Sequence, residues 1–120
     1  LLGNALATLK LYHGGKIAAV TVTTAMLKAA GAAPEETEGI IGYPRSLTGV
    51  EVALLFREDS EGRGFHVSMR SRTRVDVSAV AVSLGGGGHP RAAGVLLAGD
   101  LAEVTDKVLA ALDKSQWMDS

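Results

Sequence analysis

Alternation of apolar and polar residues in the middle of the chain predicts two β-strands. In residues 50–57 and 65–70, apolar side chains occupy every second position, the period at which a strand turns the same face to the core. The polar, glycine-containing residues 58–64 separate the two runs, so we expect an antiparallel hairpin. The second strand is predicted to carry on its polar face His66, Ser68 and Arg70.

Apolar residues at helical spacing predict two helices in the second half of the chain. In residues 77–84 they recur at i, i+3, i+4 and i+7, and Asp76 is placed to cap the first turn. Residues 101–112 repeat this spacing, and Asp100 with Glu103 forms a near capping box at their start.

Three further elements are predicted before the hairpin. Apolar residues at helical spacing indicate a helix over residues 2–12, and the Ile, Val and Thr residues of 17–23 indicate a buried strand. A short helix follows, capped by Thr23 or Thr24 and ended before Gly31.

Prolines mark the ends of one more predicted helix. Pro34 fits its first turn, with acidic residues near its positive end, and Pro44 bounds it. A short buried strand is expected over residues 95–98. The order of elements predicts the α/β (α+β) class, with a mixed β-sheet of about four to five strands flanked by helices.

Composition bounds the class of protein. The 120 residues suit one domain, and the 47% hydrophobic content fits a packed core. The chain has no cysteine, which excludes disulfides and thiolate metal sites and suits a cytoplasmic protein. No apolar run approaches the roughly 20 residues that span a membrane. Because the chain begins with Leu rather than Met, we expect a fragment of a longer protein.

The charge distribution points to limited contact with anions. A net charge of −1 argues against a polyanion that covers the whole surface. All seven arginines nevertheless lie in the middle of the chain, between Arg45 and Arg91, and arginine is the better bidentate partner for phosphate. We interpret Arg57 and Arg63 as surface charges.

A run of four glycines, Gly85 to Gly88, is followed by His89. Without Cβ atoms the backbone N–H groups are open to a ligand, and successive N–H groups attract anions. The run matches neither the P-loop nor the dinucleotide-binding pattern. From chemistry alone, an anion-binding loop and a structural tight turn both remain open. The aspartates are scattered and the three histidines isolated, so the chain lacks a credible metal centre.

Three ordered motifs resemble those of the DHHA1 domain, the C-terminal half of DHH-type phosphoesterases. They are the Gly-Gly-Gly-His and Ala-Ala-Gly of residues 86–94, the Val-Ser-Met-Arg-Ser of residues 67–71 followed by Val-Asp-Val-Ser, and residues 38–53. The pattern is most similar to the bifunctional oligoribonuclease/pAp phosphatase (nanoRNase) group. The resemblance implies a linker helix over 1–15 from a missing catalytic domain, a substrate-binding domain over 16–113 and a polar tail over 114–120.

The resemblance also implies roles for individual residues. Arg70 and His89 would hold a terminal phosphate, with Ser71 supporting Arg70. Backbone amides of Gly86, Gly87 and Gly88 would approach a nucleoside. Arg45 matches a family position that contacts either ligand or sheet, and Arg91 fits a surface charge.

The implied function is binding of short 5′-phosphorylated oligoribonucleotides, pAp or similar nucleotides in a phosphoesterase. Manganese would belong to the N-terminal DHH catalytic domain, so the present chain alone is expected to be inactive. Three alternatives are the C-terminal domain of a single-strand exonuclease, that of a cyclic-dinucleotide phosphodiesterase, and a non-catalytic RNA-binding or dimerisation module. An oligomer is compatible with all of these.

Overall fold

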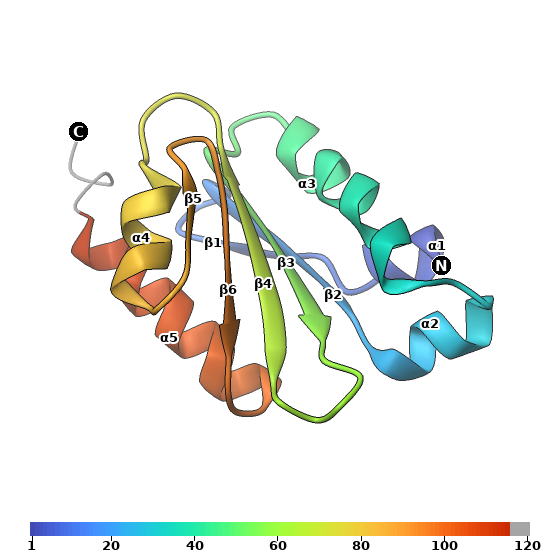
Figure 1. Ribbon diagram of the computed structural model, residues 1–120. Helices are drawn as coiled ribbons and strands as arrows, with labels where there is room; N and C mark the ends of the chain where they lie inside the picture. The colour runs from blue at the N-terminus through green and yellow to red at the C-terminus, as the bar shows by residue number, and fades with distance from the viewer. Residues whose placement is uncertain (116–120) are drawn as a thin grey trace.

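The strands form one mixed sheet in the computed structural model, which describes residues 1–115 (Figure 1). They are β1 (Lys10–Tyr12), β2 (Ile17–Val22), β3 (Val52–Glu58), β4 (Phe65–Ser71), β5 (Gly87–His89) and β6 (Ala92–Leu97), in the spatial order β1-β2-β3-β4-β6-β5. Only β2 and β3 are parallel neighbours; the other pairs are antiparallel. The mixed α/β class is confirmed, but six strands replace the predicted four to five because two three-residue strands form the edges.

Helices cover the two faces of the sheet unequally (Figure 1). The α-helices are α1 (Leu2–Leu6), α2 (Thr24–Ala30), α3 (Gly42–Ser46), α4 (Val77–Ser83) and α5 (Leu101–Lys114), and a 3₁₀ helix, η1, spans Pro34–Ile41. The larger core lies between the sheet and the pair α4 and α5. On the other face, α1, α2 and η1 pack on β2 and β3 only.

This unequal cover explains the burial of each strand. β2 and β3 are buried on both faces, and their apolar runs are nearly continuous. Along β4, buried and half-buried residues alternate strictly, and β6 follows the same pattern with Leu96 exposed. The hairpin of β3 and β4 and its polar face are therefore as predicted. The outer face of β4 and β6 is the part of the sheet left open to a ligand.

The predicted helix caps are confirmed. The Thr23 hydroxyl accepts a hydrogen bond from the Met26 N–H at 3.1 Å, and Gly31 ends α2 in the left-handed conformation. Asp76 accepts from the Ala79 N–H at 3.2 Å. Asp100 and Glu103 form a reciprocal capping box. These local contacts fix where α2, α4 and α5 begin.

The predicted helix over residues 2–12 is wrong beyond Leu6. Its second half forms β1, which pairs with β2 through a turn that carries positive φ at His13 and the two following glycines. The Thr8 hydroxyl accepts from the Thr21 N–H at 2.7 Å and ties the approach to β1 onto β2. Hydrogen bonding to a neighbouring strand thus outweighs the helical spacing of the leucines.

Pro44 does not bound the preceding helix as predicted. The chain passes from η1 directly into α3, and Pro44 is the third residue of that helix. Proline is tolerated there because the first N–H groups of a helix have no intrahelical partner.

Two predictions concern the chain ends. The predicted polar tail begins at Lys114, which instead ends α5, and its Trp117 and Met118 lie outside the described residues. Within residues 1–115 no helix is long and apolar enough to cross a membrane.

Candidate functional site

The last two glycines of the run form the edge strand β5 together with His89. The second and fourth glycines of the run pack against β6. A Cβ on Gly86 would lie 2.2 Å from the carbonyl oxygen of Gly94, and one on Gly88 would lie 2.5 Å from the Cα of Ala93. Gly88 also has φ of +147°. The structural interpretation therefore applies to these two glycines: they let β5 approach β6 closely.

Gly87 is different from its two neighbours. A Cβ at Gly87 would have no atom within 4 Å, so packing does not require a glycine there. Its cross-strand partner is Gly94, which in turn pairs with Ser68 on β4. Ser68, Gly94 and Gly87 thus form one row across the open face of the sheet. The two glycines have no side chain, so the backbone is accessible at these positions.

Arg70 and His89 lie in the adjacent row of the same face. Arg70 pairs with Ala92, and Ala92 pairs with His89, and directly opposed residues point to the same side of a sheet. With strands about 4.8 Å apart, the two Cα atoms are roughly 10 Å from each other, a gap that long side chains close on a bound group. The structure thus brings together Arg70, Gly87 and His89.

Both side chains of this row are accessible. Arg70 is half-buried, and its Nη1 donates to the carbonyl oxygen of Met69 in its own strand at 3.0 Å. His89 is exposed and makes no side-chain hydrogen bond to the described residues. A guanidinium and an imidazole beside open backbone suit an anion such as phosphate.

Ser71 points to the opposite side of β4 and is 1% exposed. Its hydroxyl contacts the carbonyl oxygens of Val75 at 2.6 Å and Pro90 at 3.1 Å. Arg91, predicted to be a surface charge, is exposed but donates from Nη1 to the Ser71 hydroxyl at 2.9 Å and to the Val75 carbonyl at 2.6 Å. These contacts hold the β5–β6 turn against the end of β4. None of them reaches the Arg70 side chain, so support of Arg70 by Ser71 stays a prediction.

Arg45 lies on α3, outside the Arg70 row. It is exposed, and its carbonyl oxygen accepts from Nη2 of Arg72 at 3.2 Å. It lines a separate shallow groove of about 350 Å³ together with Arg72 and Thr73. A role for Arg45 in binding stays a prediction.

A groove of about 180 Å³ adjoins Arg70 between η1 and β4, and we call it the η1–β4 groove. His66, predicted only as a residue of the polar strand face, lines this groove, and sequence reasoning missed its partner: Nε2 of His66 lies 2.7 Å from Oδ1 of Asp59. Arg63, predicted to be a surface charge, binds both oxygens of that carboxylate at 2.9 Å.

Asp59 is 4% exposed. The side chain of Arg63, followed by that of His66, holds the pKa of this carboxyl well below its usual range. The carboxyl is therefore ionised at neutral pH and accepts a hydrogen bond from Nε2 of His66. The signal in the sequence was the hairpin itself, since the loop after β3 returns Asp59 toward the start of β4.

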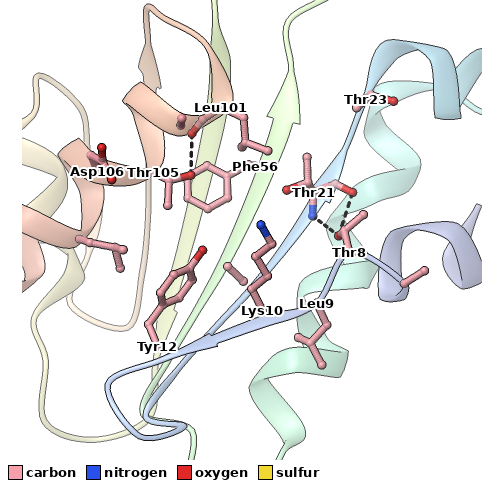
Figure 2. Close-up of a pocket in the computed structure, with 14 residues that line it drawn as sticks. Thr8, Leu9, Lys10, Tyr12, Thr21, Thr23, Phe56, Leu101, Thr105 and Asp106 are labelled. Carbon is pink, nitrogen blue, oxygen red and sulfur yellow. Dashed lines mark hydrogen bonds between the residues drawn. The ribbon is translucent and has the colours of Figure 1, made fainter.

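A cavity of about 790 Å³ lies between the β1–β2 edge and α5 (Figure 2). It opens on the Phe56 face of the sheet, opposite to Arg70. Tyr12 and Lys10 point into it from β1, toward Phe56 and Thr105 (Figure 2). Its lining is mostly apolar, with Lys10 and Asp106 as its charged members. We favour the Arg70 face as the functional site because it has the groups that bind anions.

No three His, Asp or Glu side chains in residues 1–115 form a group that could hold a metal ion. The manganese implied by the resemblance is assigned to the N-terminal catalytic domain, and it stays a prediction.

Comparison with known proteins identifies the family. The DHHA1 domain matches residues 14–117. The bifunctional oligoribonuclease and PAP phosphatase NrnA of Thermus thermophilus is 36% identical over 113 residues, which are 93% of this chain and 33% of that protein.

Solved structures agree on the fold. An exopolyphosphatase-related protein from Bacteroides fragilis superposes with a TM-score of 0.88 at 25% identity, covering 99% of this chain and 35% of the other. The pGpG-specific phosphodiesterase PggH from Vibrio cholerae gives 0.60 at 15% identity, covering 98% and 37%, and supports the fold alone. The chain thus spans about a third of the length of these relatives. By its sequence and its fold, this chain belongs to the DHHA1 domain family.

Proposed function

We propose that this domain holds the phosphorylated end of a short oligoribonucleotide, or of pAp, in a DHH phosphoesterase. The observation that carries the proposal is the row formed by Arg70, Ala92 and His89 on an open sheet face. Arg70 and His89 supply donors to a terminal phosphate, and Gly87 in the next row leaves the backbone open to the ligand. The similarity to an oligoribonuclease and PAP phosphatase supports this choice of substrate.

The remaining machinery would be supplied by another domain. We expect the manganese ions to be bound by an Asp-His-His catalytic domain that presents its metals across a cleft from the Arg70 face. This chain's own residues then bind and orient the phosphate. We expect the whole enzyme to act in the cytoplasm, where its substrates arise from RNA turnover.

Recognition of one phosphorylated end agrees with the charge of the domain. A protein that follows a long polyanion needs many cations, whereas this chain has a net charge of −1. Two charge-assisted contacts contribute about 1.5–3 kcal/mol each. An affinity of about a millimolar, equivalent to roughly −4 kcal/mol, is therefore expected of this chain alone.

The test is a titration followed by backbone NMR shifts, with pAp, pApA and unphosphorylated ApA as ligands. The two 5′-phosphorylated ligands should shift the amides of Gly87, His89 and Arg70, and ApA should not. Arg70→Ala should weaken binding about 10- to 100-fold, the loss of one charge-assisted hydrogen bond. The variant should fold, because the Arg70 side chain donates only to its own strand.

Lys28→Ala is the matched control. It removes the same charge from an exposed position on α2, which lines neither the Arg70 row nor the adjoining groove, and should bind as the wild type does. The proposal fails if ApA moves the same amides as pApA, or if both variants bind equally well. Tighter binding of tRNA than of pAp would instead support the RNA-binding module.

A further inference from the structure

The η1–β4 groove has one wall made by an unusual helix. η1 is a 3₁₀ helix of eight residues, longer than the three or four that are common. In a 3₁₀ helix the side chains at i and i+3 eclipse, so Glu35, Glu38 and Ile41 share one side. All three line the groove. The carboxylates of Glu35 and Glu38 make no hydrogen bond or ion pair to the described residues, whereas Glu36 caps the N–H of Ala33.

The facing wall is the open side of β4, with His66, Ser68 and Arg70. Two residues of a strand span about 6.6 Å, and three residues of a 3₁₀ helix span about 6 Å. The side chains that η1 and β4 turn to the groove therefore repeat at nearly the same spacing. Both elements run in the same direction (Figure 1). Just beyond their C-terminal ends, Nη2 of Arg72, the residue after β4, donates to the carbonyl oxygen of Arg45 on α3, the helix that follows η1. Ile41 is thus nearest the Arg70 end, and Glu35 nearest His66.

His66 is a fixed part of this wall. The ionised Asp59 carboxylate only accepts hydrogen bonds, so Nε2 of His66 carries a proton. Nδ1 makes no hydrogen bond to residues 1–115, and in the neutral ring it is an acceptor. Asp59 is itself held by Arg63 and by the N–H groups of Glu61 and Arg63. A ligand therefore meets a preformed surface.

The size and chemistry of the groove select its occupant. About 180 Å³ is below the 300–1,000 Å³ typical of sites for drug-sized ligands, and suits a heterocyclic base rather than a nucleotide. The charged groups that line it are two carboxylates, Glu35 and Glu38, and two guanidinium groups, Arg57 and Arg70. The carboxylates accept hydrogen bonds from N–H donors. Leu55 and Ile41 are only 2% and 4% exposed, so the accessible lining of the groove is mostly polar. Arg70 lines one end of the groove and also belongs to the row of Arg70, Ala92 and His89 that is proposed to bind the phosphate.

We propose that the η1–β4 groove is a nucleobase subsite that prefers bases with an exocyclic amino group. The phosphate next to that base binds Arg70 and His89, and the amino group donates to Glu38, which lines the groove together with Ser68. Carboxylates recognise base amino groups in this way. The inference rests on the proposed function, because it places the base beside that phosphate.

The test compares three ligands on this chain by backbone NMR: ribose 5-phosphate, 5′-CMP and 5′-UMP. The chain has a core on each face of its sheet and is used as it stands. All three ligands should shift the Arg70 and His89 amides. CMP should also shift those of Glu38 and Ser68 and bind at least about fivefold more tightly than UMP, whose ring has a carbonyl in place of the amino group.

Glu38→Gln removes the charge and should bring the CMP-to-UMP affinity ratio close to one while ribose 5-phosphate binds unchanged. Glu36→Gln is the matched control: it makes the same change on the same helix, outside the groove, and should keep the ratio. Equal binding of CMP and UMP to the wild type, with the Glu38 and Ser68 amides unmoved, would overturn the base subsite and leave the phosphate row intact. If ribose 5-phosphate also leaves the Arg70 and His89 amides unmoved, the proposed function fails as well.

Discussion

Substituting the glycines of β5 one at a time separates packing from ligand access. In Gly88→Ala, the new Cβ would lie 2.5 Å from the Cα of Ala93 and 2.6 Å from the carbonyl oxygen of Ala92. Both are backbone atoms of β6, so relief requires the two strands to separate. The φ of +147° at Gly88 adds strain for any residue with a Cβ.

The magnitude follows from these two effects. Backbone strain at such a position costs about 1–3 kcal/mol, and overpacking costs about 1–3 kcal/mol. Alanine also restricts the unfolded chain more than glycine does, which stabilises the folded state by about 0.4–1 kcal/mol. We therefore expect Gly88→Ala to lose about 2–4 kcal/mol of the free energy of unfolding, or roughly 10–15 °C in Tm for a domain of this size.

The assay is urea unfolding, with the midpoint and the slope m measured for each variant. Gly87→Ala is the matched control, because its Cβ would have no neighbour within 4 Å; its stability should stay within about 0.5 kcal/mol of the wild type. The same variant should weaken nucleotide binding if the ligand approaches the backbone there. Stability that is unchanged in Gly88→Ala, or lower in Gly87→Ala, would refute the assignment of these glycines.

Three further predictions test the electrostatic contacts and caps. Hydrogen bonds from Arg63 and His66 lower the pKa of Asp59 in the folded protein. The stability that Asp59 contributes to the fold is therefore complete above its unfolded pKa of about 3.9 and is lost as the pH falls below that value. Urea unfolding from pH 7 to 2 should show that the free energy of unfolding depends less on pH in Asp59→Asn than in the wild type. Although burial raises the pKa of Glu51, hydrogen bonds from the N–H groups of residues 73–75 lower it overall; Glu51→Gln should cost about 1–2 kcal/mol and speed amide exchange there. Asp76→Ala removes the cap of α4 and should cost about 1 kcal/mol in urea unfolding.

Local patterns in the sequence were enough to predict much of the fold. The alternation along β4 set which side chains face outward, because the strand period of two holds wherever one face is buried. The caps Thr23, Asp76 and Asp100 marked helix starts, since a cap is a contact between residues two or three apart. The family motifs also selected Arg70, Gly87 and His89, which the structure places on one face.

Contacts between residues that are distant in the sequence determined the features of the fold that local patterns did not predict. Residues 10–12 have helical spacing, yet they form a strand because β2 offers an edge for hydrogen bonding. Gly86 and Gly88 are required by the closeness of β6, a neighbour that no local pattern reveals.

The η1–β4 groove also depends on tertiary structure. Asp59 and His66 meet only through the hairpin, and Glu38 and Ser68 line the same groove only because η1 packs on β3. The sequence by itself determined which face of β4 is polar and at which capping residues α2, α4 and α5 begin. The tertiary structure decided which of these surfaces meet, because strand pairing and packing join residues that are distant along the chain.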